Sequence, residues 1–283
     1  MTSEKPSDQA KAKVVEHITP KIGSNLTWDD YNRLLFDAAT NGQHKFCEYI
    51  YEWANTNDHA RLLDARGMLY KAAKGGQRKI CELARKWLPP TGDFTEMIRG
   101  AARGGHMELC IMARDWIKAS GEKYGLPAPT VMISAAARGG HRDLCELARQ
   151  WANDDKLDTG RLGIIEMLCQ AAQGGHRELC ELARKWMLGA QTDYSRMLRY
   201  AAEGGHRELC DLAIEWAHAE GQEVNYNPML EGAARGGHLD LCIHAHEMGA
   251  TSFSMMATYA ANANHRDLCE LASNWAGQKL SQH

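Results

Sequence analysis

Histidine and cysteine recur four residues apart along this 283-residue chain. Six copies carry H-x-x-x-C and two carry glutamine instead of histidine: His106–Cys110, His141–Cys145, His176–Cys180, His206–Cys210, His238–Cys242, His265–Cys269, Gln43–Cys47 and Gln77–Cys81. Residues at this spacing share one helical face, so each pair could supply two metal ligands. A structural zinc site needs four, and the next stacked helix is roughly 8–10 Å away. We therefore expect no metal. The histidine should cap a helix and bond the backbone of a neighbouring copy, while the cysteine packs inside.

The cysteines also bear on the redox environment. Eight of the nine fall in this one column, and a disulfide needs Cα atoms within roughly 7 Å. Neighbouring copies should therefore not be bridged, which is typical of a reducing compartment such as the cytoplasm or nucleus. The ninth, Cys169, lies outside the column and is expected to be partly exposed, with no neighbouring base for catalysis.

The sequence gives little support for phosphate, nucleic-acid or membrane binding. Gly-Gly precedes most of the histidines, but the order of a phosphate-binding loop is absent. The formal net charge of −3 gives no general attraction to nucleic acid or anionic membranes, although an arginine patch could still bind DNA or RNA in a steeply salt-dependent way. There is no apolar run of ~20 residues and no signal-peptide core at the N-terminus. We expect no catalytic residues, no cofactor, no small-molecule substrate and no membrane partner.

The copies share one pattern of helices. Each has a Met nine residues before the histidine position (Leu34 in the first copy), then an Ala pair, Gly-Gly, the histidine and an apolar stripe. Gly-Gly can end a first helix through a positive φ, and the stripe predicts a second, amphipathic helix. Such a unit cannot bury its own apolar face. We predict an all-α helix-turn-helix solenoid of eight repeats over residues 28–276, with an arm or cap at 1–27 and a tail at 277–283.

Seven of the eight tryptophans end the second helix: Trp53, Trp87, Trp116, Trp151, Trp186, Trp216 and Trp275. A column of this kind favours a continuous, packed aromatic seam over an exposed surface that stacks on bases. The regular methionine column likewise favours core over an adaptable binding surface.

The pattern resembles a known family. The stretch AAEGGHRELCDLA at 201–213 and the triplet Met248-Gly249-Ala250 are similar to the helical half of an ankyrin repeat, over nearly the whole of 28–276. The Thr-Pro-Leu-His opening is absent, and the L-C-x-L-A form resembles divergent ankyrin-like proteins of large nucleocytoplasmic DNA viruses. The resemblance implies a non-enzymatic scaffold for protein–protein interaction, such as a viral protein that engages a host factor in the cytoplasm or nucleus. The alternative is a structural virion or assembly component.

In such a solenoid the varying positions are free to bind a partner, and the first helices line the concave face. Arg and Tyr are frequent at interface hot spots. Slots three, six and seven residues before the histidine yield two candidate groups, one of Tyr70, Lys71, Lys74, Arg99, Arg103 and Arg138, the other of Arg199, Tyr200, Arg235 and Tyr259. An ordinary solvated face remains the alternative. The connections at 54–66, 117–130 and 152–166 are further candidates.

Overall fold

The computed structural model describes residues 27–56, 60–89, 94–120, 128–156, 160–187 and 192–280. These residues form sixteen α-helices and one short 3-10 helix, with no strand among them, so the predicted all-α class is confirmed. The chain divides into two compact units, Met1–Gly125 and Leu126–His283. The sequence pattern predicted one array and did not indicate this division. Apart from Thr27, the predicted N-terminal arm lies outside the described residues.

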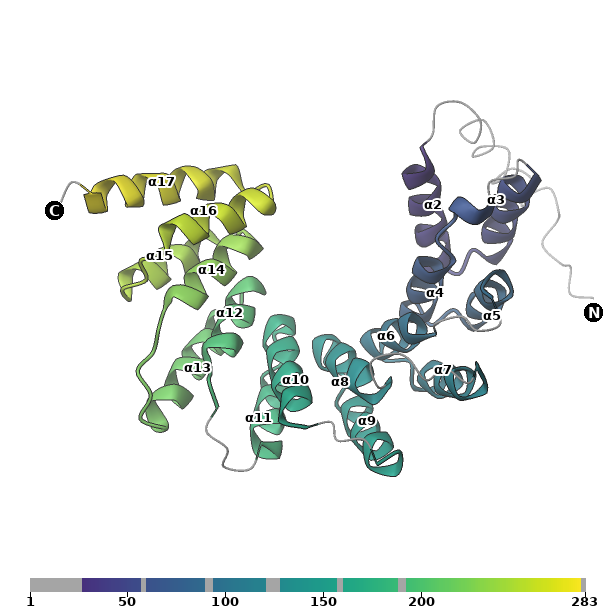
Figure 1. Cartoon of the computed structure of the whole chain (residues 1–283), viewed down its shortest axis with the longest axis horizontal. Coiled ribbons are helices and arrows are strands. Elements are labelled where there is room, and N and C mark those ends of the chain that lie inside the picture. The colour runs from purple at the N-terminus through teal and green to yellow at the C-terminus, as the bar shows by residue number, and fades with distance from the viewer. Residues whose placement is uncertain are drawn as a thin grey trace, which may run out of the picture. The chain divides into compact units, whose positions relative to one another are not determined.

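The first unit contains three helix pairs (Figure 1). Helices α2, α4 and α6 pack in series, and each also packs against the helix that follows it in its pair. The bounds are α2 Trp28–Thr40, α3 His44–Thr56, η2 Ala60–Leu62, α4 Ala65–Lys74, α5 Arg78–Trp87, α6 Thr95–Gly104 and α7 Met107–Ser120.

The second unit contains five helix pairs built in the same way. The first helices α8, α10, α12, α14 and α16 pack in series, and each contacts its own second helix. The bounds are α8 Ala128–Gly139, α9 Arg142–Asp154, α10 Gly160–Gly174, α11 Arg177–Trp186, α12 Ser195–Glu203, α13 Arg207–Ala219, α14 Asn227–Gly236, α15 Leu239–Glu247, α16 Phe253–Asn262 and α17 Arg266–Leu280.

Each turn between paired helices follows the predicted backbone chemistry. The second glycine of Gly-Gly takes a positive φ, as Gly205 does at 80°. The last copy has Ala-Asn in place of Gly-Gly, and there Asn264 takes the left-handed conformation at φ 62°. Asn tolerates this region better than most residues, so the turn is kept where the glycine is lost.

The repeated apolar positions form the core of both units. All seven column methionines have no exposed surface: Met68, Met97, Met132, Met167, Met197, Met229 and Met256. The prediction that this column is core is therefore confirmed. Close helix approach adds to the packing, since a Cβ at Gly100 would lie 2.2 Å from the carbonyl oxygen of Tyr70 on the preceding first helix.

The helices extend further than the repeat pattern indicated. Helix α10 begins at Gly160 and so occupies half of the connection predicted at 152–166. Helix α17 continues to Leu280, past the predicted end of the array at 276. In the part of the chain that the structure describes, no helix has the length and apolar character to cross a membrane.

Candidate interaction surfaces

Four histidine rings bond their repeat to the one before it. The Nε2 atom lies within hydrogen-bond distance of a backbone carbonyl oxygen three residues before the preceding histidine or glutamine position. The pairs are His106 with Lys74 at 3.0 Å, His176 with Arg138 at 3.2 Å, His206 with Gln173 at 3.2 Å and His238 with Glu203 at 3.1 Å. Because a carbonyl can only accept, Nε2 carries the proton and donates it. The predicted bond to a neighbouring copy is confirmed. The ring itself makes no cap hydrogen bond at positions such as His206.

Gly-Gly makes room for this ring. A Cβ on Gly175, the second glycine of its pair, would lie 2.6 Å from Cε1 of His206 in the next repeat. A Cβ on Gly204, the first glycine of the following pair, would lie 2.4 Å from the Gln173 carbonyl oxygen that accepts the bond. Both glycines and the histidine therefore form one contact between repeats, which explains why the three residues recur together.

The cysteine column is structural. Burial raises the pKa of Cys110 and Cys180 to about 12, so both thiols stay protonated and unreactive. The Sγ of Cys180 lies 3.9 Å from the Leu168 carbonyl oxygen of the paired helix. No disulfide joins the nine cysteines, and no three potential ligands among the described residues cluster closely enough to hold a metal. The expectation that Cys169 is partly exposed was wrong, since it has no exposed surface.

Five of the column tryptophans are linked to the preceding repeat through another flat side chain. A flat group eight residues after one repeat's histidine position covers the tryptophan of the next repeat. At three junctions between repeats the flat group is a guanidinium. The distances from the arginine Cζ to the ring centroid are 4.4 Å for Arg85 and Trp116, 4.5 Å for Arg149 and Trp186, and 4.6 Å for Arg184 and Trp216. At two other junctions the flat group is a ring, Tyr51 on Trp87 at 4.1 Å and His246 on Trp275 at 4.3 Å. At these five junctions the predicted aromatic seam consists of separate pairs of flat groups, each joining one repeat to the next. Because arginine interleaves the rings, their faces are covered by cations.

In the first unit, five of the predicted site residues lie together on α4 and α6. We call Tyr70, Lys71, Lys74, Arg99 and Arg103 the basic first-helix patch; all five are half-buried or exposed. The Tyr70 hydroxyl accepts a hydrogen bond from Arg103 at 3.3 Å, which ties the two helices. Arg99 pairs with Glu96 at 2.6 Å. Glu96 is the single acidic residue on these two helices, against five lysines and arginines. The adjacent α2 carries Asp37 in the slot of Lys71 and bounds the patch.

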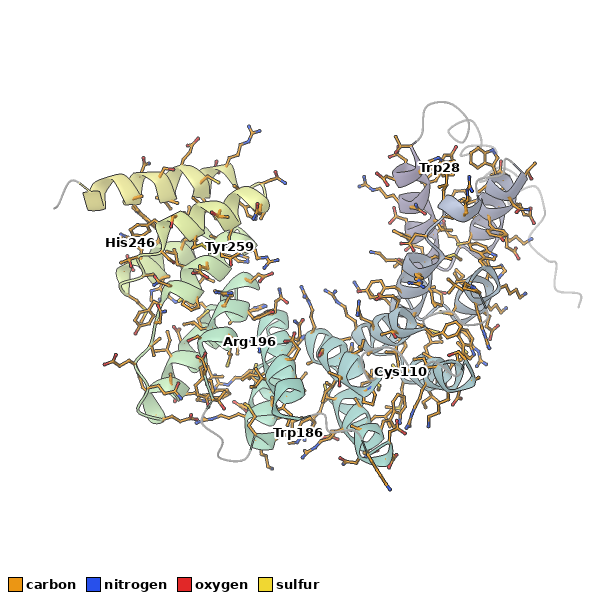
Figure 2. All side chains as sticks on the ribbon, viewed as in Figure 1. Trp28, Cys110, Trp186, Arg196, His246 and Tyr259 are labelled. Carbon is orange, nitrogen blue, oxygen red and sulfur yellow. The ribbon has the colours of Figure 1, made fainter. Side chains whose placement is uncertain are left out.

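In the second unit, the predicted site residues are neutralised by carboxylates of the same face. Arg199 pairs with Glu231 at 2.5 Å, and Arg235 lies 3.7 Å from Glu203. Tyr200 is half-buried on α12. Tyr259 is half-buried on α16 (Figure 2). The remaining predicted residue, Arg138, lies on α8 and donates to Gln170 at 3.4 Å. This group is therefore a mixed-charge surface, whereas the first group is basic.

Some variable slots are not available for binding. Gly100 and Gly232, which occupy the slot six before the histidine, are buried against the preceding first helix. The connection candidates fall partly outside the described residues, at 57–59, 121–127 and 157–159.

The second helices carry a surface that the column analysis missed. One and five residues after the histidine position, charged pairs form on the exposed face: His44–Glu48, Arg78–Glu82, Arg142–Glu146 and Arg177–Glu181, at 2.9 to 3.3 Å. Two repeats replace the pair with apolar residues. Met107 and Ile111 on α7 are 41% and 45% exposed, and Leu239 and Ile243 on α15 are 46% and 39% exposed. Comparing the exposed columns, and not only the core columns, would have found them.

Comparisons with known proteins add no identification. No protein-family model matches this sequence, and no curated protein matches it either.

Proposed function

We propose that the chain is a divergent ankyrin-like solenoid that serves as a non-enzymatic scaffold and binds an acidic partner protein through the basic first-helix patch. Two features support this proposal. The helix pairs pack in series within each unit, as a repeat array requires. The inter-repeat bonds use glycines, histidines and main-chain carbonyls, which leaves the side chains on the first helices free to vary.

The charge difference between the two groups carries the proposal. In the second unit, arginines of the first helices are matched by Glu203 and Glu231. Glu96 is the single carboxylate on α4 and α6 and pairs with Arg99, so neither helix offers an acid to Lys71 or Lys74. An excess of positive charge beside Tyr70 favours a partner segment rich in Asp and Glu. The resemblance to viral ankyrin-like proteins makes a host protein of the cytoplasm or nucleus the expected partner.

A charge-reversal comparison tests the proposal. Lys71→Glu/Lys74→Glu reverses two charges on α4, and Lys79→Glu/Lys86→Glu reverses two exposed charges on α5. Both variants change the net charge equally. Lys71 and Lys74 both lie in the last turn of α4, whereas only Lys86 of the α5 pair lies in a last turn. The α4 variant should therefore be the more destabilised of the two, and circular dichroism must first show that both variants are folded. Each protein is purified with its partners from the cells that express it, and the partners are quantified by mass spectrometry. We expect a partner that is retained by the wild type and the α5 variant and lost by the α4 variant.

Two results would contradict this function. Equal retention of the partner by all three proteins would show that the patch is an ordinary solvated face. Recovery of the same set of particle proteins by all three, or self-association in solution, would instead favour a structural component of a virion or assembly.

A further inference from the structure

The apolar pair on α15 interrupts a charged surface. Leu239 and Ile243 occupy the slots that hold Arg207 and Asp211 on α13 and Arg266 and Glu270 on α17. Four residues after Ile243, the same face of α15 carries Glu247. Residues four apart share one helical face, so Leu239, Ile243 and Glu247 form one exposed stripe. Two exposed aliphatic side chains where both adjacent repeats carry ionic side chains are a local departure with no benefit to the core.

The neighbouring helices surround this stripe. Asp211 on α13 lies 3.9 Å from His244 on α15, and the ring of His246 on α15 stacks on Trp275 of α17 at 4.3 Å. Helix α15 therefore lies between α13 and α17 (Figure 1). Because the three helices share one repeat register, Asp211 and Glu270 lie in the rows on either side of Ile243.

The surroundings of the stripe are acidic. Helices α13, α15 and α17 together carry seven carboxylates and three lysines or arginines. The exposed carboxylates around the stripe include Asp211, Asp240, Glu247 and Glu270, whereas Arg207 and Arg266 lie in the rows on either side of Leu239. The end of the stripe at Ile243 and Glu247 is therefore the acidic one. The second apolar pair, on α7, has a different setting. Helix α7 carries two acids and two bases, and the preceding second helix α5 carries four bases and one acid.

We propose that the α15 stripe with its acidic border is a docking site for a basic amphipathic helix of another protein. The partner helix would place two apolar side chains, spaced three or four residues apart, on Leu239 and Ile243, and lysines or arginines opposite Asp211, Glu247 and Glu270. Helix-in-groove recognition uses this spacing of anchors. A second copy of this chain is the poorer match, because each surface has seven carboxylates against three lysines or arginines and the two excesses would repel. The site lies on second helices of the other unit and does not depend on the basic first-helix patch.

The experiment uses a defined probe and a charge-neutral variant. The probe is a fluorescein-labelled 14-residue peptide with leucines at i, i+3, i+4 and i+7 and lysine or alanine elsewhere. Its control is the same peptide with glutamate for lysine. Leu239→Arg/Ile243→Glu installs the ion pair of the other repeats, so it should fold and leaves the net charge unchanged. Met107→Arg/Ile111→Glu makes the same change on α7. Binding is measured by fluorescence anisotropy at two salt concentrations, after circular dichroism has verified helicity.

We expect the lysine peptide to bind the wild type and the α7 variant alike, and to bind the α15 variant at least tenfold more weakly. Asp211→Asn/Glu270→Gln should weaken binding several-fold and reduce its salt dependence. Equal affinity for wild type and the α15 variant would overturn the proposal, as would equal binding of the glutamate peptide. A wild-type dimer in light scattering that the α15 variant dissociates would show that a second copy covers this face, and would also overturn it.

Discussion

Gly175→Ala tests the histidine contact between repeats. Gly175 has φ +80°, and an added Cβ would lie 2.6 Å from Cε1 of His206. The left-handed conformation costs a non-glycine residue about 1–2 kcal/mol. Forcing a methyl group against a ring held by the Gln173 carbonyl adds about 1–3 kcal/mol. We therefore expect a loss in the free energy of unfolding of about 2–5 kcal/mol.

Gly221 provides a matched control for the cost of placing alanine in the left-handed conformation. Gly221 has φ +70° and no atom within 4 Å of an added Cβ. Gly221→Ala should therefore lose only about 1–2 kcal/mol. In a His206→Ala background the ring is gone, so Gly175→Ala should then cost no more than Gly221→Ala. The coupling between the two sites should be about 1–3 kcal/mol.

Urea denaturation followed by tryptophan fluorescence measures these differences, and variants are compared where the m values agree. If Gly175→Ala and Gly221→Ala lose the same stability, or if His206→Ala leaves the cost of Gly175→Ala unchanged, the ring does not occupy the space above the glycine. The proposed origin of the Gly-Gly-His triplet would then be refuted.

Three further predictions concern other contacts. Arg184→Lys keeps the charge but removes the flat group 4.6 Å from the centroid of Trp216. Urea denaturation should therefore show a loss of about 0.5–1 kcal/mol in the free energy of unfolding. An unchanged midpoint would contradict a stabilising contact between the guanidinium and the ring. The hydrogen bond from the Tyr194 hydroxyl lowers the pKa of Glu220 from 4.5. The ionised carboxylate therefore stabilises the folded state above pH 4.5, and this stabilisation is lost on acidification. Glu220→Gln should make the free energy of unfolding fall less steeply between about pH 5 and 3, as followed by urea denaturation at each pH. Burial raises the pKa of eight thiols to about 12, whereas Cys269 is only half-buried; mass spectrometry after maleimide treatment of the folded protein should find Cys269 labelled first, and uniform labelling would contradict the burial.

The periodic features were predictable from sequence because each reflects a requirement that every repeat must meet. Buried methionines, positive-φ glycines and the histidine bond recur at several of the junctions where one helix pair packs on the next. The burial of Cys169 could not be read in the same way. Its slot holds exposed or half-buried residues elsewhere, such as Arg99 and Arg199, and only the local packing of α10 decides its environment.

Contacts between different columns were harder to predict. The tryptophan column indicated stacking on itself, whereas five of the rings are covered by a residue from a slot two positions earlier in the preceding repeat, as Arg149 covers Trp186. The candidate sites were harder still. Arg199 and Tyr70 looked equivalent as variable first-helix residues. Glu231 neutralises Arg199, whereas among the described residues no acid pairs with Lys71 or Lys74, which lie beside Tyr70 on α4. Charge balance across helices depends on which residues meet, and spacing within a single repeat does not contain this information.

The inter-repeat hydrogen bond has a consequence for the evolution of this chain. Its acceptor is a main-chain oxygen, and the residues that provide it are as different as Lys74, Arg138, Gln173 and Glu203. Any amino acid compatible with the end of a helix presents the same oxygen. Mutations at these positions can therefore alter the chemistry of the surface while the joint between repeats is preserved. A scaffold built in this way can acquire new specificities by single substitutions without first accumulating compensatory changes in its core.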